Sequence, residues 1–136
     1  MKNNELLGTL VLVNPEIEND PAGRKGDIGV VAYVDDPNDE IYLRFPDEFE
    51  AVYPMDAVFA LKEREKIFAA QEAVTAPVDL NGYKDLYKIT TLQDMGRSID
   101  IWNALEIARD NPGIWPNSLM GVGEGQTRQQ SQSFAR

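Results

Sequence analysis

Two acidic loops hold the side chains whose types and spacing could bind a metal ion. Their oxygen-bearing residues are Asp35, Asp36, Asn38, Asp39 and Glu40 in one loop, and Glu16, Glu18, Asn19 and Asp20 in the other. Hard cations such as calcium bind carboxylate and amide oxygens in such loops. Neither loop has the spaced ligands, the central glycine and the terminal glutamate of a calcium-binding loop. We therefore expect these residues to form turns and to aid solubility, with neither a metal nor a cofactor bound.

A set of aromatic and basic side chains predicts a second kind of site, a surface that binds a partner. Its members are Tyr33, Tyr42, Arg44, Phe49 and Tyr53. Strand alternation directs Tyr33 and Tyr42 away from the apolar positions between them, and the intervening turn makes them cross-strand neighbours. Together with Asp47, the aromatic rings could hold a cation. The alternative is that helices later in the chain cover this face.

Catalytic residues are harder to find. The chain has no histidine and no cysteine, the side chains that most often carry proton transfer and nucleophilic attack near neutral pH. With 23 acidic residues, a catalytic pair of carboxylates remains possible, but no spacing in the sequence identifies such a pair. Neither a nucleophile motif nor a phosphate-binding glycine motif is present in strand–helix context. The sequence therefore predicts a protein that is not an enzyme.

The elements that must position these residues are five short strands. Apolar runs bounded by turn residues predict them at residues 9–13, 27–34, 41–45, 51–53 and 57–61, with a long polar loop after the first. Alternation predicts that one face of the second and third strands is buried. Its members are Ile28, Val30, Ala32, Val34, Ile41, Leu43 and Phe45.

This layout resembles the Src-homology-3-like small β-barrel, in the broad sense that includes KOW and Tudor-like modules. The resemblance covers residues 6–61 and rests on the strand at 8–13, the long polar loop, the segment 26–31 and the strand at 41–45. It implies a binding role rather than catalysis. The chain lacks the acidic-aromatic loop and the paired tryptophans of the peptide-binding type, so it does not imply binding of proline-rich peptides. Its acidity also differs from that of KOW modules.

The second half of the chain predicts helices. One is expected over 62–75, and another from a cap at Thr91 to residue 109, where Gly96 bends or splits it and Ser98 then caps the second piece. An apolar stripe on this helix is expected to be buried, formed by Leu92, Met95, Ile99 and Trp102 and widened by Ile101, Leu105 and Ala108. The fold class is thus α+β: a five-stranded barrel at 1–61, two or three helices packed on it at 62–120, and a disordered tail at 121–136.

Charge indicates the kind of partner. The net charge is −10, and residues 1–61 contain 13 acidic and four basic side chains. Such a surface repels nucleic-acid phosphates and anionic membranes, and favours a basic protein partner. No apolar run approaches the length needed to span a bilayer, and the absence of cysteine fits the cytoplasm.

We expect a cytoplasmic protein-interaction module. Two alternatives stay open: an acidic decoy, such as an immunity, antitoxin or DNA-mimic protein that occupies a basic nucleic-acid enzyme, and an enzyme that works through carboxylates. A purely structural subunit of a larger assembly is a further alternative.

Overall fold

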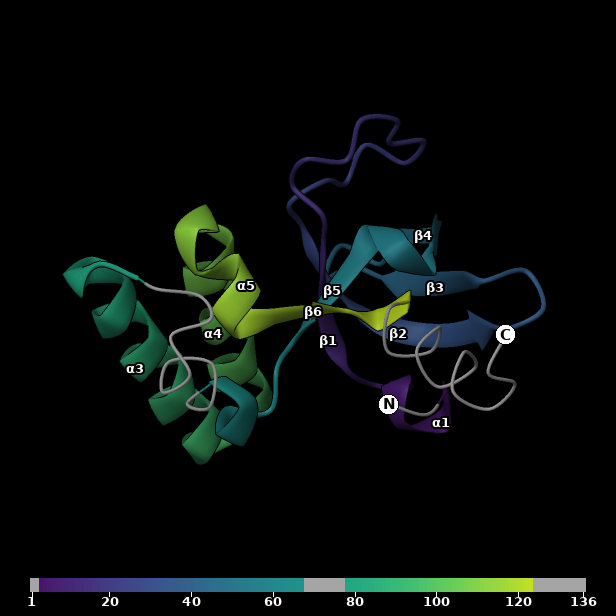
Figure 1. The fold of residues 1–136 in the computed structure, drawn as a ribbon. Coiled ribbons are helices and arrows are strands. Elements are labelled where there is room, and N and C mark those ends of the chain that lie inside the picture. Colours follow the sequence, from purple (N-terminus) through teal and green to yellow (C-terminus); the bar gives the residue numbers. More distant parts are fainter. Residues whose placement is uncertain (1–2, 68–77, 124–136) are drawn as a thin grey trace, which may run out of the picture. The chain divides into compact units, whose positions relative to one another are not determined.

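The computed structural model describes residues 3–67 and 78–123 (Figure 1). The elements follow the chain as α1 (Asn3–Leu6), β1 (Leu10–Val13), β2 (Ile28–Asp35), β3 (Glu40–Arg44), β4 (Glu50–Pro54), the 3-10 turn η1 (Met55–Ala57), β5 (Val58–Leu61), α3 (Leu80–Met95), α4 (Ser98–Arg109), η2 (Pro112–Ile114), α5 (Trp115–Ser118) and β6 (Leu119–Gly121). The chain is therefore α+β, and all five strands expected from the sequence are present. Among the described residues, no helix is both long and apolar enough to cross a membrane.

Six strands form one sheet in the order β4-β3-β2-β1-β5-β6. The pairs β1–β2, β1–β5, β2–β3 and β3–β4 are all antiparallel. Because β4 and β6 are the two end strands of this order, strand pairing within residues 3–67 and 78–123 does not close the sheet, and the expected five-stranded barrel is not confirmed. The sixth strand was not expected, since it is only three residues long and lies at the start of the expected tail.

The described residues divide into two compact units, residues 3–60 with 121–123, and residues 61–67 with 78–120. In the first unit, turn chemistry sets the hairpins. Asp39 and Glu48 adopt positive φ angles of 56° and 68° at the turns after β2 and β3. Figure 1 shows the long loop between β1 and β2 extending away from the sheet.

The apolar side of the first unit is lined by alternate residues of neighbouring strands. Its members include Val11, Val13, Val31, Ile41, Leu43, Tyr53 and Val58, all of which are buried. Three of the residues expected there are not on this face: Ile28 and Val30 lie on the opposite face, where Ile28 is buried and Val30 half-buried, and Ala32 is exposed. The cause is an irregularity in the β2 ladder, described below.

In the second unit, α3 and α4 are joined at Gly96. This residue is in the left-handed conformation with a φ angle of 75°, and its amide bonds to the Leu92 carbonyl. The expected split at this glycine is confirmed, but both expected caps are wrong. Thr91 lies inside α3, which instead begins at Asp79, whose side chain accepts a 2.8 Å hydrogen bond from the Gly82 amide.

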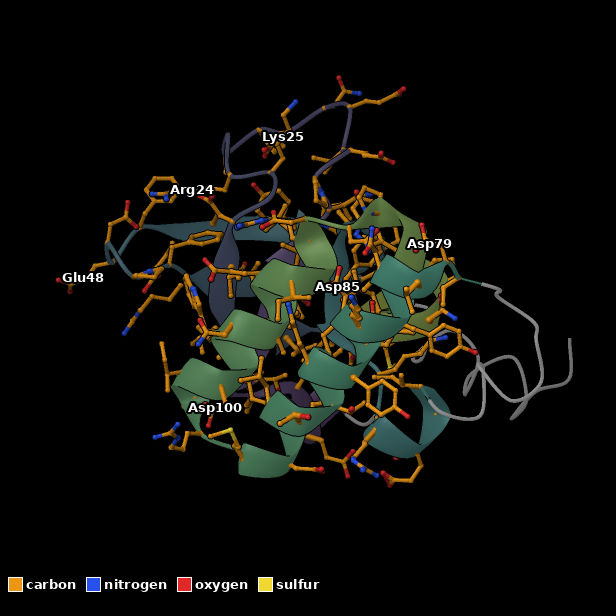
Figure 2. All side chains as sticks on the ribbon, turned by 90° about the vertical axis from the view of Figure 1, so that its left-hand side faces the viewer. Arg24, Lys25, Glu48, Asp79, Asp85 and Asp100 are labelled. Atoms are coloured by element: carbon orange, nitrogen blue, oxygen red, sulfur yellow. The ribbon has the colours of Figure 1, made fainter. Side chains whose placement is uncertain are left out.

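The helix after the split, α4, begins one residue earlier than the sequence predicted. Arg97 is the cap of α4, and its amide donates a 3.1 Å hydrogen bond to Asp100 Oδ2. Figure 2 shows Asp79 and Asp100 near the starts of their helices. Carboxylates at these positions complement the positive ends of the helices.

The apolar contact between α3 and α4 differs from the expected stripe. Met95 and Ile99 are exposed, because the break at Gly96 and Arg97 changes the helical phase between them. Leu105 and Ala108, which were expected to widen the stripe, are buried, and so are Leu86, Ile89 and Ala104. Of the helix expected over 62–75, residues 64–67 are helical, and residues 68–77 lie outside the described residues.

The expected tail begins with three described residues. Gly121 ends β6, and Val122 is 2% exposed. A Cβ added at Gly123 would lie 3.0 Å from the Asp56 nitrogen, so this segment runs close to η1. Residues 124–136 lie outside the described residues.

Candidate interaction surface

Two tyrosines form an exposed aromatic pair on the outer face of β2 and β3. Tyr33 and Tyr42 are opposite each other in the strand register, as the sequence predicted. Their ring centroids are 5.4 Å apart and the ring planes are inclined by 78°, an edge-to-face contact. Tyr33 is 57% exposed and Tyr42 is 36% exposed. The pair therefore fixes the geometry of two large rings while leaving much of their surface in water.

The same face continues onto β4. Val52 is opposite Tyr42 in the register, and it is 36% exposed. Tyr33, Tyr42 and Val52 thus form a row across three adjacent strands, which we call the tyrosine row. Sequence reasoning did not include Val52, although the alternation in Glu50–Pro54 was a usable signal for it.

An ion pair borders the tyrosine row. Arg44 and Glu50 are opposite each other on β3 and β4, one register step from Tyr42 and Val52. The Arg44 guanidinium donates hydrogen bonds of 3.1 Å from Nε and 2.7 Å from Nη2 to the same Glu50 oxygen, Oε2. Both side chains are more than half exposed, so the pair adds little stability. It does neutralise Arg44, the basic member of the predicted surface.

A β-bulge places Tyr33 on this face. Val31 is opposite Leu43 and Tyr33 is opposite Tyr42, so Ala32 is an extra residue between two consecutive partners. The bulge reverses the inside–outside alternation that the sequence predicted before it. Val31, expected outside, is 2% exposed, whereas Ala32, expected inside, is exposed. After the bulge the expected orientation of Tyr33 is restored.

Phe49 belongs to a separate cluster that already contains a cation. The Arg24 guanidinium carbon lies 4.9 Å from the centroid of Phe45 and 4.6 Å from that of Phe49. Arg24 also forms ion pairs with Asp27 and Asp47. Figure 2 shows Arg24 on the long loop and Glu48 on the turn after β3. The sequence left open that these rings and Asp47 hold a cation, and the position beside Phe49 and Asp47 is taken by Arg24 of the chain's own loop.

The electrostatics of this cluster fit a permanent ionic contact. The hydrogen bond from Arg24 holds the pKa of Asp47 below its ordinary value. The same bond raises the pKa of Arg24. A guanidinium that contacts two rings and two carboxylates makes cation–π and charge-assisted contacts at once. The cluster anchors the loop to the sheet, and it does not offer Phe49 as a free ring.

Tyr53, the fifth predicted surface residue, is fully buried and is not part of the tyrosine row. It lies on the inner side of β4, one position from Val52. Its hydroxyl donates a 2.6 Å hydrogen bond to Asp20 Oδ1 and accepts one from the Arg24 amide. Burial, together with the Asp20 charge, raises the pKa of the Tyr53 hydroxyl. Tyr53 therefore holds the loop in place as a neutral donor.

The acidic loops form turns, as the sequence predicted. Asp20 accepts hydrogen bonds from the amides of Ala22, Gly23 and Lys25. Partial burial raises the pKa of Asp20, but the bonds from Tyr53 and these amides outweigh it, so the net shift is downward. In the other loop, the Asn38 amide group donates to Asp35 Oδ2 at 2.8 Å. Within residues 3–67 and 78–123, no three His, Cys, Asp or Glu side chains are grouped to hold a metal ion.

Comparison with known proteins adds nothing to this description, because no family model, curated protein or solved structure significantly matches the chain.

Proposed function

We propose that this protein is a non-enzymatic interaction module of the cytoplasm, and that the tyrosine row binds a protein partner. The observation that carries the proposal is the exposed edge-to-face contact between Tyr33 and Tyr42. Tyrosines are enriched at protein interfaces because a ring buries a large area and loses little conformational entropy. A fixed pair of rings is already arranged for contact.

We also propose that β1 to β5 build the small barrel expected from the resemblance to Src-homology-3-like modules, and that this barrel stays open along the edge of β4. Support comes from the strand order, in which β5 returns to pair with β1 after the β2–β3–β4 meander. The bulge in β2 adds the local bend and twist that small barrels use to curl a sheet. In such a barrel the tyrosine row lies on the outside.

The electrostatics support a binding role over carboxylate catalysis. A carboxylic acid that donates a proton near neutral pH needs a raised pKa. The shifts resolved for Asp20, Asp47 and Asp100 are all downward, and each has a hydrogen-bond donor as a cause. These three groups serve as fixed negative charges in loops and helix caps.

The test compares binding by two matched variants of the full chain. Tyr33→Ala with Tyr42→Ala removes the tyrosine row, whereas Tyr83→Ala removes a ring of similar exposure from α3. Each protein is immobilised and exposed to lysate of cells that express it, and the bound proteins are quantified. A partner retained by the wild type and by Tyr83→Ala, but lost by the double variant, is the expected result. Equal retention by all three would refute the proposal.

The same experiment separates the alternatives. A decoy would retain a basic nucleic-acid enzyme and inhibit it stoichiometrically, with binding that weakens steeply as salt rises. Turnover of a small molecule by the purified chain would favour the carboxylate enzyme.

A further inference from the structure

The free edge of β4 has a hydrogen-bonding pattern that an added strand could use. At the two ends of the β3–β4 ladder, the Phe45 amide bonds to the Phe49 carbonyl and the Met55 amide bonds to the Asp39 carbonyl. In an antiparallel ladder, hydrogen-bonded and non-hydrogen-bonded pairs alternate. The pairs Arg44–Glu50, Tyr42–Val52 and Glu40–Pro54 are therefore the non-hydrogen-bonded ones.

The main-chain groups of three β4 residues consequently point away from β3. Glu50 and Val52 each direct an N–H and a carbonyl to the free edge, and Pro54 directs a carbonyl alone. Among the described residues, β4 is the end strand of the sheet and pairs with β3 only. An extended peptide that adds to such an edge gains main-chain hydrogen bonds. Pro54 limits the pairing at one end.

The side chains of these three residues lie on the face of the tyrosine row. Glu50, Val52 and Pro54 are exposed, whereas the alternating residues Ala51 and Tyr53 are buried. A strand paired with β4 would therefore extend the row of Tyr33, Tyr42 and Val52 by one side chain. On the added strand, the side chains two positions before and after that one would lie opposite Glu50 and Pro54.

Charge determines which strand fits. The segment 35–54 contains seven carboxylates and one basic side chain, Arg44, which is paired with Glu50. The carboxylates gather in the turns at both ends of β3 and around Glu50. A second copy of this edge would bring like charges together, which is unfavourable. Both hydrogen bonds from Arg44 go to Oε2 of Glu50, so a lysine or arginine opposite Glu50 would meet its other oxygen, Oε1, in a segment whose net charge is negative.

We propose that the β4 edge takes an extended basic segment of a partner protein as an added strand, with an apolar residue opposite Val52 and a lysine or arginine opposite Glu50. This inference rests on the proposed function, since it names the partner chemistry of the same surface. Negative charge at both ends of the strand steers such a segment to the edge, and the main-chain bonds fix its register.

The test uses a synthetic peptide of alternating pattern and the isotope-labelled full chain. The peptide is acetyl-Lys-Thr-Lys-Thr-Val-Thr-Lys-Thr-Lys-amide, and binding is followed by amide NMR shifts. We expect saturable shifts centred on the amides of Glu50 and Val52. A peptide with glutamate in place of every lysine, and one N-methylated at the valine and both flanking threonines, should each bind at least about tenfold more weakly.

A variant of the protein tests the same main-chain hydrogen bonds by a change in β4 instead of in the peptide. Val52→Pro removes an N–H that β3 does not use, so the ladder keeps its hydrogen bonds while the edge loses a donor. Val52→Thr keeps the donor and serves as the control. We expect peptide binding to fall at least about tenfold in the first and by less than about threefold in the second, which keeps the donor and loses only part of the side-chain contact. Circular dichroism checks that both variants fold. If Val52→Pro fails to fold, the N-methylated peptide still tests the same main-chain hydrogen bonds.

Three results would overturn the inference: no shift at Glu50 and Val52 with the lysine peptide, equal binding of the N-methylated peptide, or equal binding of the glutamate peptide. These results are distinguishable from failure of the proposed function. If the Tyr33 and Tyr42 double variant still loses its partner from lysate, the tyrosine row binds a protein in another way.

Discussion

The Tyr53 hydroxyl donates a 2.6 Å hydrogen bond to Asp20 Oδ1, which joins β4 to a loop 33 residues earlier in the chain. The same hydroxyl accepts a bond from the Arg24 amide, and the Arg24 side chain then reaches Phe49 and Asp47. A loop long enough to be mobile is thus held to the sheet at two successive points. The surface next to β4 is therefore ordered without any partner.

The first prediction concerns this hydrogen bond. Tyr53→Phe removes the hydroxyl and leaves the buried ring in place. We expect a loss of about 1–2 kcal/mol in the free energy of unfolding, because the acceptor is charged but partly exposed. Urea denaturation measures it as a lower midpoint with an unchanged slope. Tyr33→Phe, at an exposed ring, is the control and should stay within about 0.5 kcal/mol of wild type.

The second prediction concerns the bulge in β2. Val31→Asp places an unpaired charge in the buried face and should destabilise the fold by more than about 4 kcal/mol. Ala32→Asp, one residue later, should change the stability by less than about 0.5 kcal/mol, because Ala32 is exposed. Thermal denaturation of the two variants measures the contrast. The reverse order would mean that the strand alternates without the bulge.

The third prediction concerns the cation between the two rings. Arg24→Met keeps an apolar chain but removes the guanidinium from Phe45, Phe49 and the carboxylates. We expect a lower melting temperature and a weaker dependence of stability on salt, since the ionic contacts are lost. Lys25→Met makes the same charge change one residue later and should leave the melting temperature nearly unchanged. Equal effects of the two substitutions would show that net charge, rather than the cluster, determines the change.

The fourth prediction concerns the pH dependence of the second unit. Hydrogen bonds from Arg97 lower the pKa of Asp100 below its ordinary value of 3.8, although burial opposes them. A group whose pKa is lower in the folded state stabilises the fold fully above its unfolded pKa, and this contribution is lost as the pH falls through the folded pKa. We therefore expect Asp100→Asn to be less stable than wild type at pH 6, with a difference that shrinks below pH 3.8.

Denaturation curves from pH 6 to pH 2.5 check this prediction. Asp94→Asn is the control, because Asp94 is exposed on α3 and pairs with Arg64 on the surface. Its difference from wild type should be small over the whole range. A difference between Asp100→Asn and wild type that grows towards low pH would contradict the assignment of Asp100 as an ionised cap.

Much of the local structure followed from the sequence. The strands were predictable because each apolar run is short, rich in β-branched residues and bounded by Pro, Asn or Asp. The proximity of Tyr33 and Tyr42 was predictable because a short turn separates two strands. The split at Gly96 was also predictable, since glycine tolerates the left-handed conformation that ends a helix.

The errors have one physical cause, which is that strand faces and helix phases depend on distant partners. Nothing local marks Ala32 as the extra residue, since a bulge forms only when the ladder with β3 is made. The burial of Tyr53 likewise depends on Asp20, and the occupied cation site at Phe49 depends on Arg24. The caps at Arg97 and Asp79 depend on where packing ends each helix.

The sequence by itself determined the class of the protein: its α+β order, its acidic first half and its lack of histidine and cysteine, because these are properties of composition and short-range pattern. Only the tertiary structure decided which aromatic rings remain exposed, because burial is settled by residues far apart in the chain. It separated Tyr33 and Tyr42, whose exposed rings contact each other, from Phe49, which packs on Arg24 while 44% exposed, and from Tyr53, which is buried and anchors a loop.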